Sequence, residues 1–447
     1  MCPQVKINFT LSSGLVNNGL HEKSDEDCLY LNVYVPETET DELLPVMVWI
    51  HGGGYMTGDG TSQRYGPLYY MSHDIILVSV RYRLGPLGFM SLGTQDVPGN
   101  MGSRDQLMAL HWVQDNIMSF GGDPDLVTVH GQSAGSFSST YHIMSPLARG
   151  LFRRAILGSG PGGFSPSYHH FSEARAIKYG TLAAIELGCL KLNMEDTAEC
   201  LREKSVLSIL TTEYLNELSS HPSVDHDHVT EPYLPYEPEQ IMSSGDYPHD
   251  IDIMIGVVED ESLIGTQILI PAPDLFGVMR ELWNIVGPYA FLQKHTSEIT
   301  EEDIELTTYM LNHYCGPLEE LNSDKFDNLT RLATDSFFWF GVHKFLSLHT
   351  QHATGNNYYY RIKYYGEHHN IWAPGIETVP GVGHADDLYL EWDHLENEEY
   401  QLNTEDSEMS LAVTTMWSNF VKYGDPTPEG EDSVGVVWEP VTKDDIR

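Results

Sequence analysis

Short apolar runs that alternate with amphipathic segments constrain the fold of this chain more than any other feature. Most are continuous stretches of apolar residues, as expected for strands buried on both faces of a sheet. We expect strands at residues 29–35, 46–50, 76–80, 127–130, 253–257 and 358–362. Periodic apolar positions predict helices at residues 103–117, 136–144, 171–187, 330–349 and 410–423, the first with Ser103 as its N-cap. This order predicts an α/β fold with a central, mostly parallel sheet and helices on both faces.

Length and charge limit the domain count and the partners. The chain has 447 residues, with 24 Lys and Arg against 65 Asp and Glu, a formal net charge of −41. Such a charge repels nucleic-acid phosphate and anionic lipid, so we expect neither as a partner. No run approaches the roughly 20 apolar residues that span a bilayer, and no signal peptide is visible. Without repeats or linkers, residues 1–447 are predicted to form one domain, with residues 221–238 as a loop excursion.

A glycine-flanked serine is the first candidate for chemistry. Residues 131–135, Gly-Gln-Ser-Ala-Gly, have the form G-x-S-x-G around Ser133. Chance supplies this pattern often, but here it follows an expected strand and precedes an expected helix, which is the context that the motif requires. The flanking glycines leave room for a strained serine whose hydroxyl stands clear of the sheet. Ser133 is therefore the candidate nucleophile.

A serine nucleophile needs a base, which is itself oriented by an acid. His384 lies in a glycine-rich loop after the last expected strand, so it is the candidate base. In the chain order that goes with this motif, the acid lies between the serine and the histidine. The strand at residues 253–257 leads into Glu259, Asp260 and Glu261, and spacing does not choose among these carboxylates.

Another glycine-rich loop offers N–H groups to a developing oxyanion. Residues 51–54, His-Gly-Gly-Gly, follow the expected strand at 46–50, and the N–H of Ala134 follows the nucleophile. A phosphate cradle is excluded because no Gly-Lys-Ser/Thr follows these glycines. No Cys/His cluster has zinc spacing, so we expect no metal and no other cofactor.

The five cysteines are too few for a disulfide scaffold, but their spacing is informative. Cys189 and Cys200 bracket a short segment, Cys2 and Cys28 bracket a longer one, and Cys315 is left over. Two closed loops would suit an oxidising compartment, although spacing alone leaves the pairing open. Glycosylation tripeptides, each a weak signal, begin at Asn8 and Asn328.

With these residues assembled, the sequence closely resembles the type-B carboxylesterase and cholinesterase family from end to end. The landmarks are EDCLYLN (26–32), VWIHGGG (48–54), YRLGPLGF (82–89), GNMG (99–102), FGGDP (120–124), GLFRRAI (150–156), WSNF (417–420) and GDP (424–426). The resemblance implies an α/β-hydrolase fold and a serine esterase acting on a small-molecule carboxylic ester.

Carried over residue by residue, the resemblance assigns site residues and disulfides. It implies Ser133 as nucleophile, Glu261 as acid, His384 as base, and Gly53, Gly54 and Ala134 as the oxyanion hole. Glu261 is preferred because Gly-Val-x-x-Asp-Glu at residues 256–261 matches the family's run into its acid. The resemblance also implies the disulfides Cys2–Cys28 and Cys189–Cys200, and hence secretion.

Three departures from the family pattern refine these expectations. The family's N-terminal part, with its signal peptide, and its extreme C-terminus are absent, so we expect a truncated domain. Gln132 replaces the usual Glu beside the nucleophile, which lessens the attraction for a cation and is similar to juvenile-hormone esterases. No Trp lies between Cys2 and Cys28, where cholinesterases place an aromatic residue that binds choline.

Three functions follow from this resemblance. The first is a carboxylesterase or juvenile-hormone-esterase-like enzyme that works through an acyl-enzyme. The second is a non-catalytic, neuroligin-like adhesion protein, although such relatives typically lose triad members that are all present here. The third, a cholinesterase, is disfavoured by Gln132 and by the absent Trp.

Overall fold

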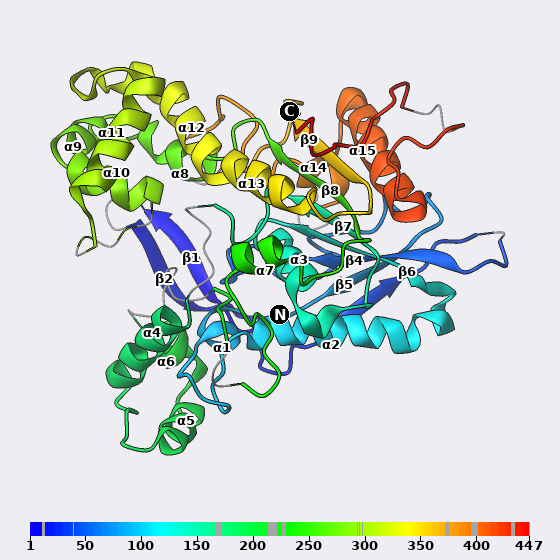
Figure 1. Ribbon diagram of the computed structural model, residues 1–447, viewed down its shortest axis with the longest axis horizontal. Coiled ribbons are helices and arrows are strands. Elements are labelled where there is room, and N and C mark those ends of the chain that lie inside the picture. The colour runs from blue at the N-terminus through cyan, green and yellow to red at the C-terminus, as the bar shows by residue number, and fades with distance from the viewer. Residues whose placement is uncertain are drawn as a thin grey trace.

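The computed structural model describes residues 1–446 except 11–13, 39, 166–171, 213–220, 226–228, 293, 295, 297, 372–375, 395–400 and 431–433, and gives residues 5–10 and 14–19 as backbone only. Its centre is a seven-stranded sheet in the order β3-β5-β4-β6-β7-β8-β9 (Figure 1). The strands are β3 (Leu31–Tyr34), β4 (Leu44–Ile50), β5 (Ile76–Val80), β6 (Gly122–Gln132), β7 (Arg154–Gly158), β8 (Asp252–Val258) and β9 (Asn357–Ile362). All neighbours are parallel except β3 and β5. The predicted α/β fold with a mostly parallel sheet is confirmed.

Both faces of the sheet are buried, which explains why its strands read as continuous apolar runs. In β4, Val46 and Val48 belong to the core beneath α2, α3 and α13, whereas Met47 and Trp49 belong to the core beneath α14 and α15. All four are fully buried. These helices are α2 (Met101–Asn116), α3 (Ala134–Met144), α13 (Phe340–His349), α14 (Leu388–Glu391) and α15 (Thr404–Tyr423).

Two smaller helical groups extend from this core (Figure 1). Helices α9 to α12 pack around their own apolar cluster, and α4 and α5 pack around another that includes Cys189. The other elements are β1 (Val5–Thr10), β2 (Gly14–Leu20), α1 (Gly85–Phe89), α4 (Glu173–Glu186), α5 (Met194–Arg202), α6 (Val206–Leu210), α7 (Pro238–Ser244), α8 (Leu263–Thr266), α9 (Leu275–Glu281), α10 (Trp283–Leu292), α11 (Glu301–Cys315) and α12 (Phe326–Thr334).

All six expected strands form, but three details differ from the sequence predictions. Strands β1, β2 and β7 were not expected. The single helix expected at 330–349 is divided, because the π-helical turn Asp335–Trp339 separates α12 from α13. Ser103 is not an N-cap: it is buried inside α2, which begins at Met101 and has Asn100 as its N-cap. The start of the helix expected at 171–187 lies outside the described residues; α4 covers the rest.

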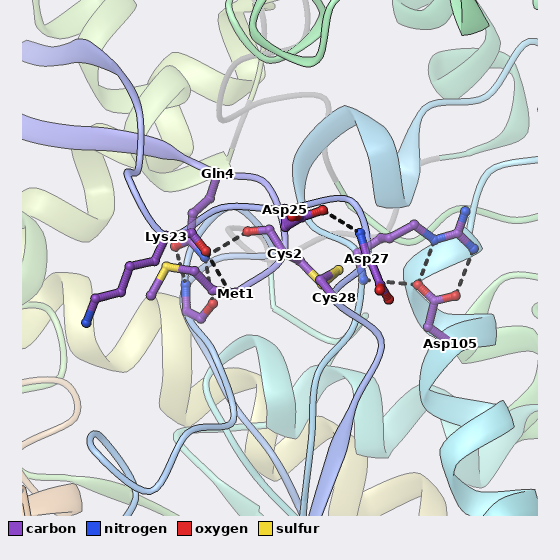
Figure 2. The surroundings of a disulfide bond; sticks show 10 residues. Met1, Cys2, Gln4, Lys23, Asp25, Asp27, Cys28 and Asp105 are labelled. Atoms are coloured by element: carbon purple, nitrogen blue, oxygen red, sulfur yellow. Dashed lines mark hydrogen bonds and ion pairs between the residues drawn. A yellow bond between two sulfur atoms is a disulfide. The ribbon is translucent and has the colours of Figure 1, made fainter.

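Both implied disulfides form. Cys2 and Cys28 are joined with their Cα atoms 4.9 Å apart, and Cys189 and Cys200 with theirs 5.4 Å apart. Figure 2 shows the first bond close to Gln4, whose side-chain amide exchanges two hydrogen bonds with the backbone of Gly58, at 2.8 and 2.9 Å. The first residues are thereby fastened beside the glycine-rich loop, residues 51–54, that follows β4.

Candidate active site

Ser133 lies at a sharp turn between β6 and α3. It has φ 56° and ψ −126°, a conformation that a residue with a side chain adopts only under strain. Its backbone N–H donates to Gly158 O at 2.9 Å, which anchors the turn to the neighbouring strand β7. This turn places the hydroxyl-bearing side chain at the carboxyl end of β6, where α/β folds bind their ligands.

The glycines of the motif are required by close backbone contacts. A Cβ on Gly131 would lie 2.2 Å from the backbone carbonyl of Gly135. A Cβ on Gly135 would lie 1.9 Å from Ile50 O on the adjacent strand β4. Neither distance is compatible with a larger side chain, so the G-x-S-x-G pattern follows from how tightly α3 packs onto the sheet.

The glycine-rich loop after β4 lies against this serine. A Cβ on Gly52 would be 3.1 Å from Ser133 Cβ. Gly53 and Gly54 both have positive φ, 108° and 62°, and a Cβ on Gly54 would meet no atom within 4 Å beyond its chain neighbours. Ala134 is the first residue of α3, so its N–H has no acceptor within the helix. The loop and the helix start therefore border the same space above Ser133.

His51 makes this loop rigid. Its ring is fully buried and stacks on Tyr82 at 4.5 Å, and Tyr82 Oη donates to His51 O at 2.8 Å. Burial lowers the pKa of His51 to about 4, so the ring is neutral and its Nδ1–H donates to Gly52 O at 2.7 Å. Backbone N–H groups in a loop fixed in this way can stabilise charge without first reorganising.

Glu261 and His384 meet at the same edge of the sheet. Glu261 follows β8, and His384 lies in a loop that follows β9. His384 Nδ1–H donates to Glu261 Oε2 at 2.6 Å, and Val258 N–H donates to Glu261 Oε1 at 2.9 Å. Glu261 is fully buried and His384 is 4% exposed. A short, buried, charge-assisted bond of this kind fixes both the orientation and the tautomer of an imidazole.

The three carboxylates after β8, which sequence alone left as alternatives, have separate partners. Glu259 forms ion pairs with Arg361 and Lys363 near the surface. Asp260 accepts a hydrogen bond from Val382 N–H at 3.2 Å, and only Glu261 contacts the imidazole. Burial raises the pKa of Asp260. The geometry agrees with the residue that the family resemblance prefers.

Several neighbours of the pair were not expected from sequence. The ring of Phe338, in the π-helical turn, lies 5.4 Å from that of His384. Asp387 is 1% exposed, and burial followed by the charge of Glu261 raises its pKa to about 7. The carboxylate of Asp386 accepts several hydrogen bonds in the loop that carries His384. Their closeness to His384 in sequence was the only available signal for the two aspartates.

Gln132 is buried beside the serine. Its Nε2 donates to Ser159 Oγ at 3.1 Å. A Cβ on Gly52 would lie 3.1 Å from Gln132 Oε1, so the amide also borders the glycine loop. Gln132 thus places a neutral amide, rather than a carboxylate, beside the serine. Phe164 is 3% exposed and packs against Phe345.

The comparisons with known proteins agree with this geometry. Residues 1–446 match the family model described as "Carboxylesterase family". This chain belongs to that family. Esterase FE4 of Myzus persicae is 33% identical to this carboxylesterase over 445 residues, covering 94% of the chain and 73% of FE4. Juvenile hormone esterase of Tribolium castaneum is 33% identical over 430 residues, covering 91% of the chain and 71% of that protein.

A solved structure gives the same assignment. The crystal structure of juvenile hormone esterase from Manduca sexta, with OTFP covalently attached, matches with a TM-score of 0.80 and 27% identity. The match covers 100% of this carboxylesterase and 82% of the Manduca chain. The α/β-hydrolase fold is therefore confirmed, as is the assignment to the serine hydrolases of carboxylic esters.

The two glycosylation tripeptides and the fifth cysteine are the remaining features singled out from the sequence. Asn328 is exposed on α12, and its Nδ2 donates to Tyr314 O at 2.7 Å. Asn8 lies in β1, whose side chains are outside the described residues. Cys315, the cysteine outside the two disulfides, is buried, which raises the pKa of its thiol to about 11. None of the helices in the described ranges is long and apolar enough to cross a membrane.

Proposed function

We propose that this carboxylesterase cleaves its substrate through an acyl-enzyme on Ser133. The Ser133 hydroxyl adds to the ester carbonyl, the tetrahedral intermediate collapses with loss of the alcohol, and water then releases the acid. The strained turn supports this role because it holds the side chain clear of both β6 and α3.

In the proposed mechanism, His384 is the general base and Glu261 orients it. The observation that carries the proposal is the 2.6 Å bond from His384 Nδ1 to Glu261 Oε2. With the proton on Nδ1, the lone pair of Nε2 is free to take the serine proton, and the carboxylate stabilises the resulting imidazolium. His384 then returns that proton to the departing alcohol.

The backbone N–H groups of Gly53, Gly54 and Ala134 are the proposed oxyanion hole. Their support is the contact of the glycine loop with Ser133, together with the N–H at the start of α3, which has no acceptor within the helix. Removing one donor from such a site typically costs about 100- to 1,000-fold in kcat, so we expect the rigid loop to contribute strongly to turnover.

The proposed substrate is a neutral carboxylic ester, with a terpenoid methyl ester of the juvenile-hormone type as the specific candidate. Gln132 supports this choice because a neutral amide beside the serine offers a cationic substrate no charge to bind. The relatives that are juvenile hormone esterases support it further. We also propose that the protein is secreted, since its two disulfides persist best in an oxidising compartment.

One experiment tests both the reaction and the substrate class. The kcat/KM values for an aryl acetate, a terpenoid methyl ester and acetylthiocholine are compared on one preparation, with Ser133→Ala as the control. We expect Ser133-dependent turnover of the first two and at least a tenfold lower value for acetylthiocholine. Gln132→Glu should raise the acetylthiocholine value relative to the aryl acetate. Preference for acetylthiocholine would contradict the substrate class, and absence of all turnover would favour a neuroligin-like role.

A further inference from the structure

The turn that carries His384 is strained and closed by one carboxylate. Ala385, the residue after His384, has φ 68°, which is unfavourable for a residue with a side chain. Asp386 N–H donates to Gly383 O at 3.0 Å, and Gly383 N–H donates back to Asp386 Oδ2 at 2.7 Å. A strained conformation persists only when its surroundings overdetermine it, and here the two reciprocal bonds enclose His384.

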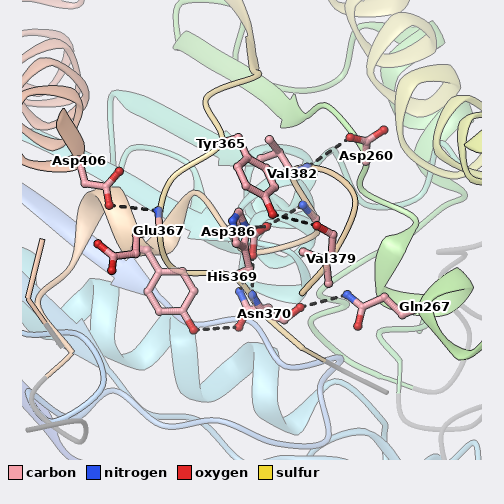
Figure 3. Close-up of polar contacts among 12 residues, drawn as sticks. Asp260, Gln267, Tyr365, Glu367, His369, Asn370, Val379, Val382, Asp386 and Asp406 are labelled. Carbon is pink, nitrogen blue, oxygen red and sulfur yellow. Dashed lines mark hydrogen bonds and ion pairs between the residues drawn. The ribbon is translucent and has the colours of Figure 1, made fainter. Parts of the chain in front are cut away.

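The same carboxylate binds a second segment of chain. Asp386 is 6% exposed, and its Oδ1 accepts from the backbone N–H of Asn370 at 2.7 Å and from Asn370 Nδ2 at 3.3 Å. Its Oδ2 also accepts from His369 Nδ1–H at 3.1 Å. Figure 3 shows Asp386 at the centre of these contacts. Each oxygen therefore accepts two hydrogen bonds, and both are needed as acceptors.

The His369–Asn370 segment is in turn hydrogen-bonded to the segment that follows Glu261. Gln267 Nε2 donates to Asn370 O at 3.0 Å, and Gln267 is fully buried just after α8, the short helix that follows Glu261. The turn of His384 is thus linked to the segment of Glu261 through Asp386, Asn370 and Gln267. Figure 3 shows the three residues in this order.

A shorter link runs in parallel. Asp260 N–H donates to Val382 O at 2.8 Å, and Val382 N–H donates to Asp260 Oδ2 at 3.2 Å. A Cβ on the adjacent Gly381 would lie 2.2 Å from Asp260 Oδ2, so glycine permits this approach. This direct link does not pass through Asp386, and it holds the start of the loop rather than the turn with His384.

The ring of His369 is held from its other side. It packs on Tyr365 with ring centroids 4.0 Å apart, and Tyr365 Oη donates to Val379 O at 2.9 Å. The packing fixes the direction in which His369 Nδ1–H points, which is toward Asp386. This donor is therefore preorganised rather than free to find water.

We propose that Asp386 is a positioning residue for His384, which it holds at hydrogen-bonding distance from Glu261 by fastening the strained turn to the His369–Asn370 segment. The inference rests on the proposed function, because it assigns a means of alignment to the proposed base. A reacting group must be held within about 0.5 Å of its productive position, and a displacement of about 1 Å can cost about 100-fold in rate.

Asp386→Asn tests the proposal because asparagine has the same shape but only one acceptor oxygen. Its NH2 group would face either Gly383 N–H and His369 or the N–H of Asn370, and two donors would then oppose each other in a buried site. We expect kcat for an aryl acetate to fall about 10- to 100-fold, with KM changed less than about threefold. The downfield proton resonance of the His384–Glu261 bond should shift or broaden.

Asp225→Asn is the matched control. Asp225 is fully buried, and its two oxygens accept from the backbone N–H groups of Tyr233 and Leu234, at 3.1 and 2.9 Å. This variant should lose thermal stability while kcat and the downfield resonance stay as in the wild type. If Asp386→Asn behaves in the same way, Asp386 is only structural and the proposal is wrong.

Two further variants, Ser133→Ala and His369→Phe, complete the test of the positioning role. Ser133→Ala, assayed in parallel, separates the two proposals. If the turnover of the wild type does not depend on Ser133, both proposals are wrong. If it does depend on Ser133 but Asp386→Asn is as active as the wild type, only the positioning role of Asp386 is wrong. If Asp386→Asn does not fold, His369→Phe retains the ring on Tyr365 and removes a single donor. It should lower kcat about threefold or more, and an unchanged kcat contradicts the proposal.

Discussion

Replacing Glu261 by glutamine retains the size of the side chain but removes one hydrogen-bond acceptor. In the wild type both oxygens accept, Oε1 from Val258 N–H at 2.9 Å and Oε2 from His384 Nδ1–H at 2.6 Å. The residue is fully buried, so water does not supply a substitute partner. A glutamine has one oxygen for these two donors.

Both orientations of the new amide are unfavourable. If its oxygen stays on Val258 N–H, its NH2 faces His384 Nδ1, and the ring keeps a bond only by moving its proton to Nε2. That tautomer presents a donor to Ser133 and no longer acts as a base. If the amide is reversed, its NH2 opposes Val258 N–H, and a buried donor without a partner costs about 1–3 kcal/mol.

These alternatives set the expected magnitudes. The wrong tautomer lowers kcat by about 1,000- to 10,000-fold, or about 4 to 5.5 kcal/mol of transition-state stabilisation. The free energy of unfolding changes by about 1–3 kcal/mol, because the side-chain volume and the packing remain. Activity therefore falls much further than stability does.

The assay is steady-state turnover of an aryl acetate, with urea unfolding on the same preparations. Asp260→Asn is the control, since Asp260 bonds Val382 N–H and makes no contact with the imidazole that the structure records. Glu261→Gln with kcat within tenfold of the wild type would refute the reasoning. An Asp260→Asn variant that is more impaired than Glu261→Gln would show that the acid was assigned to the wrong residue.

Three further predictions concern stability. In urea unfolding, Gly135→Ala should cost about 3 kcal/mol, because its Cβ would lie 1.9 Å from Ile50 O. Burial and the charge of Glu261 raise the pKa of Asp387 from 3.8 to about 7, so the folded protein keeps a proton that the unfolded chain releases. In urea titrations at several pH values, the free energy of unfolding of the wild type should therefore fall between about pH 4 and 7. Relative to Asp387→Asn, the fall should be up to about 4 kcal/mol. Opening the Cys189–Cys200 disulfide by a double serine variant should lower the free energy of unfolding by about 3 kcal/mol in urea titrations.

The sheet could be predicted from sequence because its strands are buried on both faces. A strand such as β5, Ile76–Val80, contains almost only apolar residues, and its observed bounds are those expected. The position of Ser133 also followed from local pattern, since strand, glycine-flanked turn and helix are consecutive in the chain. These features depend on neighbouring residues alone.

Other features depend on contacts between distant segments, which periodicity does not contain. The break at Asp335–Trp339 accompanies a hydrogen bond from Tyr314 Oη to Asp335 Oδ2 at 2.7 Å, made by a different helix. The choice between Asp260 and Glu261 required the family resemblance, because both follow the same strand. The contacts of Asp386 are made by His369 and Asn370, which lie earlier in the chain and show no pattern that links them to Asp386.

Covalent trapping at Ser133 tests the central claim most directly. The carboxylesterase is treated with an aryl-ester-mimicking organophosphonate, and the modified peptide is identified by mass spectrometry while turnover is followed. We predict one adduct per chain, on Ser133, that appears in step with loss of activity and is absent from Ser133→Ala. An adduct on another residue, or ester turnover that persists in Ser133→Ala, would contradict the account.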